Sequence, residues 1–494
     1  MRVFFNEDWI HFLWTRYTDN IEITPQVLKE FIYQYKGTTV TDFVMNVNGT
    51  VSTFPSKVLE SFSDKYTAKS ENGFPVDYTD TYAKSAYNLF VKENTDMYSV
   101  WIETLREIGI SPWISVRMND CHDNFENTSI RKSSQEEKHP EFWRTPYRTP
   151  DYFGKCLNYA LPEVSKMMLD YISEVLERYD VDGLELDFMR EMVLFVPGHE
   201  ECNIITEFMK SVKSRITDAE QKYGHKIKLS VIVATEPEVC FEAGLDIKKW
   251  AELGLVDMVC VIPRWETVTT NIPIEFWKSI LGKTPLSIGQ QLLVASYPGG
   301  YRTMSSVPMA YGQAYSSISR GADCVYLYNY MDTLEPGLES YCHDTSIRRH
   351  TAEILTNLTY EKLSVSERRF PLTYNDCLNY WSPTAYSLPI EFKENEQPYF
   401  RTLRISTGDL RKDTALLQLG IYSAEKLEKD DFEVYSNGIK AEFTSPVPDK
   451  NICKNDWYAF KLNSENIQRH TVIELLIKKP CMVEYMEITA TKKD

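Results

Sequence analysis

The pattern of apolar and polar positions over residues 1–330 alternates between short apolar runs and longer amphipathic segments. Short apolar runs bounded by turn residues are typical of buried strands, whereas apolar positions three and four residues apart are typical of helices with one buried face. The segment 25–35 shows the helical pattern clearly, because Thr24 suits its cap, Pro25 occupies its first turn and Gly37 follows it. The predicted helices are 25–35, 98–108, 162–179, 204–222 and 247–253.

The apolar runs between these helices predict parallel strands. The predicted strands are 2–5, 41–47, 111–120, a run within 179–191, 227–236, 256–262, 284–291 and 322–328. Eight strands that alternate with helices in this way are typical of a (β/α)8 barrel, the TIM-barrel fold. Two connecting stretches, 50–87 and 121–158, are read as irregular and are longer than ordinary connections, which favours a functional role for them.

The pattern changes after a predicted helix at 351–362. From residue 369 to the end, the runs are short and alternate in polarity, with turn signals at 436–438 and 446–449. We therefore predict a catalytic barrel over 1–364 and a small antiparallel β-sandwich, an accessory domain, over 365–494. Its clearest strands are 402–406, 416–421, 433–434, 470–477 and 483–488.

Composition narrows the possible partners. The net charge of −17 argues against nucleic acid or an anionic membrane as the main partner, and aromatic residues, at 13%, suit pockets that bind sugar rings. No segment reaches the roughly 18 apolar residues of a membrane span. The ten cysteines show no CxxC pair or zinc spacing, so free thiols are predicted. Acidic residues near the start indicate a cytoplasmic protein, or a secreted one whose signal peptide has been trimmed.

The fourth predicted strand carries two acids, Glu185 and Asp187, in the run from Tyr179 to Glu191. Their spacing of two residues sends both side chains to one face of a strand, and the leucines between and around them to the other. Arg190 and Glu191 follow directly. Two acids in one space indicate an active site, and the structural alternative is that they form buried ion pairs.

Polar residues gather at the carboxyl ends of the predicted strands, where barrel enzymes carry out their chemistry. Besides the acids of the fourth strand, the candidates for substrate binding are Asn46, Asn48, Arg117, Asn119, Asp120, Arg190, Arg264, Trp265, Gln291, Tyr328 and Asn329. Alternation along the third strand turns Arg117 and Asn119 into the barrel lumen, whereas Asp120 points outward or belongs to the loop. On the fifth strand, Glu236 shares a face with the smaller side chains and is expected to lie beside Asp187.

Two carboxyl groups across a cleft are what hydrolysis of a glycosidic bond requires. We assign Asp187 the ionised role, as nucleophile or base, because Arg117 or Arg190 could lower its pKa. Glu236 then has the role of general acid, and Glu185 orients Arg117 or binds a sugar hydroxyl. The eight histidines show no HExxH pattern, so neither a metal nor an organic cofactor is predicted, although the segment 120–123 remains a candidate for a cation or substrate site.

At these motifs the chain resembles the family-10-like glycoside hydrolases, a group of mostly uncharacterised bacterial barrel enzymes. The similar segments are LNYALPEV at 157–164, RYDVDGLELD at 178–187 and KWAELGLVD at 249–257. The resemblance covers the barrel and implies hydrolysis of a carbohydrate, with Asp187 at the acidic end of its strand. The sequence departs from that group at 188–191, where a second Asp and aromatic residues are common. Acids on strands four and five are also similar to the α-amylase type of barrel.

Two alternatives stay open. The first is a lyase or isomerase that acts on an acidic sugar, with Arg117, Arg190 and Arg264 binding its carboxylate. The second is a carbohydrate-binding barrel without turnover. The identity of the sugar, its linkage and the oligomeric state are not determined by these patterns.

Overall fold

The computed structural model describes residues 1–493 apart from 72–79, 123–129, 264–267, 292, 296–301, 331–346, 373–387 and 395–398. The described chain forms two compact units. One comprises Phe4–Ile262 and Ile280–Leu286, and the other comprises Met1–Val3, Pro263–Ser279 and Ser287–Asp494.

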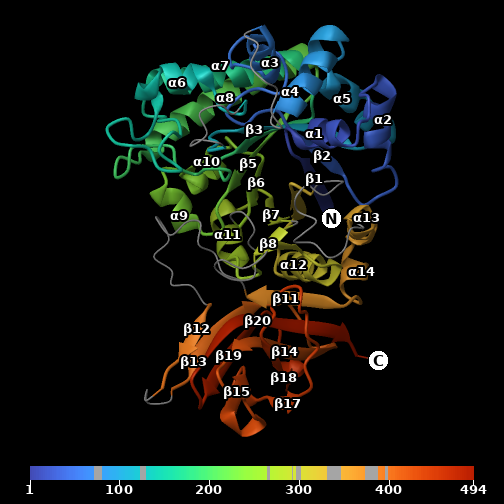
Figure 1. The fold of residues 1–494 in the computed structure, drawn as a ribbon, viewed down its shortest axis with the longest axis vertical. Helices are drawn as coiled ribbons and strands as arrows, with labels where there is room; N and C mark the ends of the chain where they lie inside the picture. The colour runs from blue at the N-terminus through green and yellow to red at the C-terminus, as the bar shows by residue number, and fades with distance from the viewer. Residues whose placement is uncertain are drawn as a thin grey trace. The chain divides into compact units, whose positions relative to one another are not determined.

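Parallel strands form a closed barrel in the order β1-β10-β7-β6-β5-β4-β3-β2 (Figure 1). This arrangement confirms the predicted (β/α)8 class. The barrel strands are β1 (Arg2–Glu7), β2 (Asp42–Asn46), β3 (Ser111–Arg117), β4 (Gly183–Asp187), β5 (Lys228–Val233), β6 (Met258–Val261), β7 (Leu286–Gln291) and β10 (Cys324–Tyr328).

Helices connect the strands, and their ends follow local sequence signals. Thr24 accepts a hydrogen bond from the backbone of Val27 and Pro25 begins α2, as predicted, while Asp96 caps α5. The helices are α1 (His11–Thr18), α2 (Pro25–Tyr33), α3 (Phe62–Glu71), α4 (Asp80–Ala86), α5 (Met97–Ile108), α6 (Ser134–Lys138), α7 (Pro162–Arg178), α8 (Cys202–Tyr223), α9 (Pro237–Glu242), α10 (Ile247–Glu252), α11 (Ile274–Leu281), α12 (Val307–Ser319), α13 (Ile347–Asn357) and α14 (Tyr360–Leu363).

Four expectations about the elements and their boundaries were wrong. The stretch 50–87 is not irregular, because it contains α3 and α4, and 121–158 contains α6. The sequence of α3, FSDKYTAKSE, is mostly polar and lacks the apolar period that marks the other helices. Strand β3 ends at Arg117 rather than at residue 120, and β5 ends at Val233 rather than at residue 236. Pro237 begins α9, which leaves Glu236 as its N-cap residue and no longer part of the strand.

The barrel strands present different side chains to their two faces. On the outer face, Phe5 and Phe43 contact Tyr35, which follows α2. On the inner face, the Trp113 indole donates a hydrogen bond of 2.9 Å to Asp42 and crosses the neighbouring β4 at Gly183. A Cβ atom at Gly183 would lie 2.1 Å from the Trp113 ring, so the glycine makes room for the tryptophan.

Two antiparallel sheets make up the C-terminal part. One has the order β11-β20-β14-β18-β17, with β12 also on β20, and the other has the order β13-β19-β15-β16. Phe432 of one sheet contacts Tyr458 and Phe460 of the other, with ring centroids 4.9 and 5.4 Å apart, as in a sandwich. The strands are β11 (Arg368–Leu372), β12 (Ile390–Phe392), β13 (Arg401–Ser406), β14 (Asp413–Tyr422), β15 (Phe432–Ser436), β16 (Ile439–Lys440), β17 (Glu442–Thr444), β18 (Asp456–Leu462), β19 (His470–Ile477) and β20 (Cys481–Lys492).

The predicted strands of this part are confirmed, and so is the predicted turn at 436–438. Asn437 and Gly438 have positive φ angles of 49° and 77°, as a tight hairpin turn between β15 and β16 requires. A separate two-stranded sheet pairs β8 (Leu293–Ala295) with β9 (Arg302–Met304).

Candidate functional site

A buried group of charged side chains lies at the carboxyl ends of β1, β3 and β4. We call Asp8, Arg117, Asp120, His122 and Arg190 the mouth cluster. The Arg117 guanidinium contacts Asp8 at 2.6 Å and Asp120 at 3.1 Å, and Arg190 lies 3.8 Å from Asp120. Asp120 also bonds Nδ1 of His122, and Nε2 of His122 lies 2.8 Å from the Arg190 guanidinium. Asp120 is therefore shared by both arginines and the histidine.

Electrostatics keep the acids of the mouth cluster ionised. Burial opposes the charge on Asp120, but His122, Arg190 and Arg117 together hold its pKa well below the usual range. Burial likewise opposes the charge on Asp8, yet Arg117 in particular lowers its pKa. Burial lowers the pKa of His122 and Arg190 adds to this effect, which outweighs the opposite influence of Asp120. A neutral His122 fits its contacts, because Nδ1–H donates to Asp120 and Nε2 accepts from Arg190.

The position of Asp120 separates two expectations. We predicted that it points outward or belongs to the loop; it belongs to the loop after β3, and its side chain does not point outward but is buried at the centre of the mouth cluster. The chain leaves β3 after Arg117, so the strand's alternation no longer sets the direction of residue 120. Asp8 was absent from the predicted set, and His122 was predicted only as part of the candidate segment 120–123. They lie beyond strand ends, and no periodic pattern marks them.

Asp187 and Glu185 lie on the lumen face of β4. Asp187 is opposite Arg117 of β3 and Ile232 of β5 in the strand register, and its side chain is 2% exposed. Its Oδ1 atom accepts hydrogen bonds of 2.9 Å from the backbone N–H groups of Met189 and Arg190. These bonds shape the turn after β4.

Glu185 lies one layer deeper, opposite Ser115 and Ser230, and is fully buried. The hydroxyl oxygens of these two serines and Oδ1 of Asn46 have no hydrogen-bond partner within the described residues. The lumen around Glu185 therefore contains buried hydrogen-bonding atoms that have no partner among the described residues. A core that served packing alone would fill this layer with apolar side chains.

The amide side chains predicted to bind substrate bond the backbone instead. Asn48 accepts from the N–H of Arg117 and donates to its carbonyl, both at 3.0 Å. Asn119 donates to the carbonyls of Leu157 and Val193 and accepts from the N–H of Leu157. Asn46 donates to the carbonyl of Ser115. These asparagines hold the strand ends and loops in place, which makes them positioning residues in this structure.

Two half-buried carboxyl groups differ from those of the mouth cluster. Burial raises the pKa of Glu236, which precedes α9 and accepts a hydrogen bond from the Thr235 hydroxyl. Glu136 of α6 was absent from the predicted set. Burial, followed by the charges of Asp120, Glu137 and Glu60, raises its pKa to about 8. Within the described chain, no hydrogen bond or ion pair reaches the Glu136 carboxyl group.

The remaining predicted residues belong to the other unit or lie outside the described residues. Arg264 and Trp265 lie outside them, and so does the side chain of Gln291, the last residue of β7. Tyr328 ends β10 and is buried, with its ring 6.4 Å from that of Tyr326. Asn329 follows with a φ angle of 47°. No three His, Cys, Asp or Glu side chains of the described chain are grouped as ligands of a metal ion.

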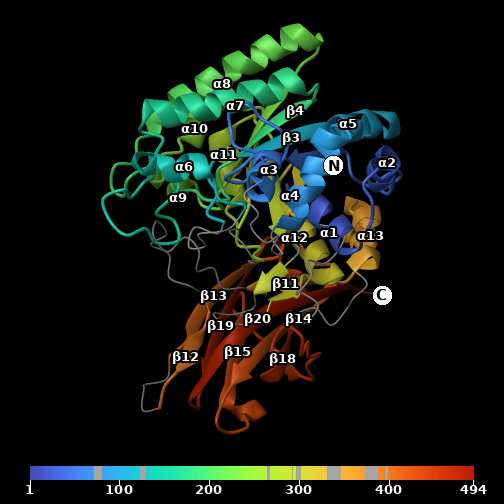
Figure 2. The same ribbon diagram turned by 45° about the horizontal axis from the view of Figure 1, so that its top comes forward.

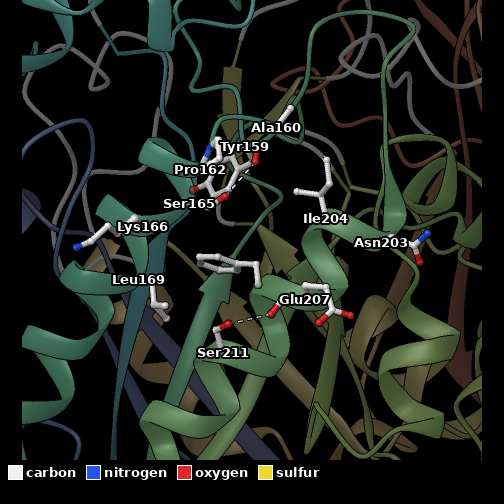
Figure 3. Close-up of a pocket in the computed structure, with 11 residues that line it drawn as sticks. Tyr159, Ala160, Pro162, Ser165, Lys166, Leu169, Asn203, Ile204, Glu207 and Ser211 are labelled. Carbon is white, nitrogen blue, oxygen red and sulfur yellow. Dashed lines mark hydrogen bonds between the residues drawn. The ribbon is translucent and has the colours of Figure 1, made fainter.

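A groove separate from the mouth cluster runs between the amino-terminal halves of α7 and α8, which lie side by side in Figure 2. It encloses about 520 Å³, and Leu169, Ile204 and Phe208 are among the apolar residues that line it (Figure 3). The hydroxyl of Tyr159, another lining residue, donates to the carbonyl of Met118 at 2.6 Å. None of the predicted site residues lines this groove.

Comparison with known proteins does not assign the chain to a family. No protein-family model matches the chain, and no curated protein matches its sequence. Among solved structures, the chain is similar to the glycoside hydrolase domain of PgaB from Bordetella bronchiseptica, at 10% identity and a TM-score of 0.42, over 66% of this chain and 93% of that one. An α-amylase from Anoxybacillus matches at 11% identity and a TM-score of 0.40, over 97% and 98% of the two chains.

An α-galactosidase from Geobacillus stearothermophilus, solved in complex with stachyose, matches at 10% identity and a TM-score of 0.36, over 97% of this chain and 55% of that one. Likeness at this level assigns neither a family nor an activity to this chain. The described part of the chain contains no helix that is both long and apolar enough to cross a membrane.

Proposed function

We propose that the protein is a glycoside hydrolase that cleaves an O-glycosidic bond of an oligosaccharide or glycoside. The observation that carries the proposal is the contrast between two carboxyl groups on neighbouring strand ends. Asp187 ends β4 with two backbone N–H donors on one oxygen, and Glu236, beyond the end of β5, has a raised pKa. One ionised and one protonated carboxyl group are the pair that this chemistry needs.

The roles follow from this difference. The protonated Glu236 donates its proton to the leaving glycosidic oxygen as the bond to the anomeric carbon breaks. The Asp187 carboxylate either attacks the anomeric carbon or removes a proton from an attacking water molecule. The mouth cluster positions the turn after β4, because Arg190, whose N–H is bonded to Asp187, also contacts Asp120 and His122 through its side chain. Arg117, Asp120 and Arg190 thus support the reacting carboxylate.

The charge balance of the mouth cluster favours hydrolysis over the lyase or isomerase alternative. Recognition of a uronic acid needs an arginine whose charge is available to the substrate. Here the charges of Arg117 and Arg190 are balanced by those of Asp8 and Asp120, with His122 neutral. A neutral sugar is therefore the preferred substrate class.

The test is the hydrolysis of a panel of aryl glycosides and neutral oligosaccharides by the wild type and by two variants, Asp187→Asn and Glu236→Gln. Removal of a general acid costs about 10²–10⁴-fold in rate. We expect Glu236→Gln to lose less on aryl glycosides, whose leaving groups need little protonation, than on oligosaccharides. Glu238→Gln is the matched control, because Glu238 lies two residues away on α9 and is exposed.

Wild-type activity in both Asp187→Asn and Glu236→Gln would overturn the assignment of the site. Binding of glycans without turnover by the wild type would show a carbohydrate-binding protein instead. An unsaturated product that absorbs ultraviolet light would show a lyase.

A further inference from the structure

Two cysteine thiols meet beside the mouth cluster. The Sγ atoms of Cys121 and Cys156 are 3.0 Å apart, although 35 residues separate them in sequence. Both side chains are buried, with exposed fractions of 0% and 1%. A disulfide has a bond of about 2.05 Å between the two sulfur atoms. The thiols therefore need to approach by only about 1 Å to reach bonding distance.

The backbone on either side of the two cysteines is already tied together. The Asn119 side chain accepts from the N–H of Leu157 at 2.8 Å and donates to its carbonyl at 3.3 Å. The carbonyl of Cys156 accepts a hydrogen bond of 2.7 Å from the N–H of Arg144. These bonds hold the segments around 119–121 and 156–157 next to each other. A bond between the sulfur atoms would add a covalent link to an arrangement that already exists.

Another buried cysteine has different surroundings. The Cys240 thiol donates to the backbone carbonyl of Ala234 at 3.6 Å, as expected of a cysteine that fills space in a core. Cys121 and Cys156 instead present their thiols to each other. Cys121 also lies directly between Asp120 and His122, so any constraint on Cys121 acts on two members of the mouth cluster.

We propose that Cys121 and Cys156 form a disulfide when the chain folds under oxidising conditions, and that this bond fastens the segment that carries Asp120 and His122. Closure breaks two S–H bonds and forms one S–S bond. The two electrons and two protons pass to a small-molecule disulfide, such as oxidised glutathione, which becomes two thiols. The reaction is independent of the proposed hydrolase activity.

The chemistry of the thiols indicates when the bond forms. The thiolate is the reactive species in disulfide exchange. Burial, and the contact between the two thiols, raise the pKa of Cys121, and burial raises that of Cys156. The folded pair is thus slow to react. We expect the bond to form while the chain folds, and to persist once it is buried.

The test refolds the full chain from the reduced, denatured state, either in oxidised and reduced glutathione or in a reducing agent alone. Free thiols are then blocked with N-ethylmaleimide in denaturant, and intact mass and peptide mapping follow. The oxidised protein should carry two fewer maleimide groups and yield a peptide that links Cys121 to Cys156. Cys240→Ser should retain this link and Cys156→Ser should lose it. Two blocked thiols at 121 and 156 after oxidative refolding, or a link from either one to another cysteine, would overturn the proposal.

Hydrogen exchange tests the effect on the mouth cluster without relying on a variant that folds. The amides of 118–122 and 156–159 should exchange more slowly in the cross-linked wild type than in the reduced wild type, and those of 240–245 should not change. Equal exchange in both states at 118–122 would overturn the claim that the bond fastens this segment.

Discussion

Among the described residues, one buried cluster of ion pairs lies at the mouth of the barrel, and another lies in the C-terminal sheets. In the sheets, Arg369 of β11 contacts both carboxyl oxygens of Glu487, at 2.8 and 3.1 Å, and Asp449 at 2.7 Å. Glu487 also accepts from Tyr485 and Gln418. At the barrel mouth, Asp120 has a comparable central place between Arg117, Arg190 and His122.

The two clusters differ in what surrounds the paired charges. In the sheet cluster, Glu487 lies inside an antiparallel sheet and is surrounded by its partners. The mouth cluster contains a neutral histidine, and the charge of Asp120 contributes to the raised pKa of the nearby Glu136. Buried ion pairs alone therefore do not mark a functional site. Unpaired carboxyl groups and a titratable side chain beside the pairs are the more informative signal.

The largest expected effect on the free energy of unfolding comes from removing the central carboxylate of each cluster, Asp120 or Glu487. Asp120→Ala removes the carboxylate that Arg117 and Arg190 share, and Glu487→Ala removes the carboxylate that Arg369 contacts twice. Each change leaves buried positive charge less well compensated, so each should lower the free energy of unfolding by about 3–5 kcal/mol. Urea unfolding measures this loss. We expect glycosidase activity to fall only in Asp120→Ala, when both variants are assayed at a temperature where they are folded. Loss of activity in folded Glu487→Ala would contradict the distinction between the two clusters, in which only the mouth cluster supports the active site.

A smaller effect is expected from the asparagines that bond the backbone in each region. Asn48→Ala removes two hydrogen bonds to the Arg117 backbone. Asn437→Ala removes three backbone hydrogen bonds: one from the N–H of Val472 and two to the carbonyls of Asn466 and His470. Each change should cost about 1–3 kcal/mol in the free energy of unfolding. Only Asn48→Ala should lower kcat, because it alone releases the strand end that carries Arg117. Thermal unfolding together with initial rates checks both statements.

The Glu136 carboxyl group should make stability depend on pH. Its folded pKa of about 8 exceeds that of an unfolded glutamate, so the unfolded state loses its proton first and stability falls as pH rises from about 4.5 to about 8. Glu136→Gln removes this penalty. It should raise stability at pH 9 by about 1 kcal/mol, since the group is only half-buried, and change little at pH 5. Equal unfolding midpoints of variant and wild type at pH 9 would argue that Glu136 is solvated.

The smallest expected effect belongs to His122. Burial lowers its folded pKa below 6.5, so it contributes stability above that pH, which is lost as pH falls and the unfolded histidine gains a proton first. His122→Asn should reduce the slope of stability against pH between about 6.5 and 5. His139, which is exposed on its loop, provides the control. An unchanged slope would mean that His122 is protonated within the mouth cluster.

Much of the fold could be predicted because the barrel strands and the sheet strands carry a regular period. On β3, β4 and β5, the apolar side chains face the surrounding helices. Arg117, Glu185 and Asp187 therefore lie on the opposite face, which lines the lumen. The polar helix α3 was missed because no such period marks it. Asp8 and Glu136 were missed from the site, and His122 was included only within the candidate segment 120–123. The reason is related, because each of these residues follows a strand or lies in a connecting stretch where spacing does not predict the direction of a side chain.

By itself, the sequence determined the order of the eight barrel strands and the lumen face of β3 and β4. It therefore determined that Asp187 and Arg117 share that face, because side-chain alternation is a local property of extended backbone. Only the tertiary structure decided which acids are paired. Asp120 became the centre of a buried cluster because the chain turned inward after Arg117, whereas Glu236 became the N-cap residue of α9 because Pro237 ended the strand's path. Pairing and burial depend on contacts between distant segments, and those contacts lower the pKa of Asp120 and raise the pKa of Glu236.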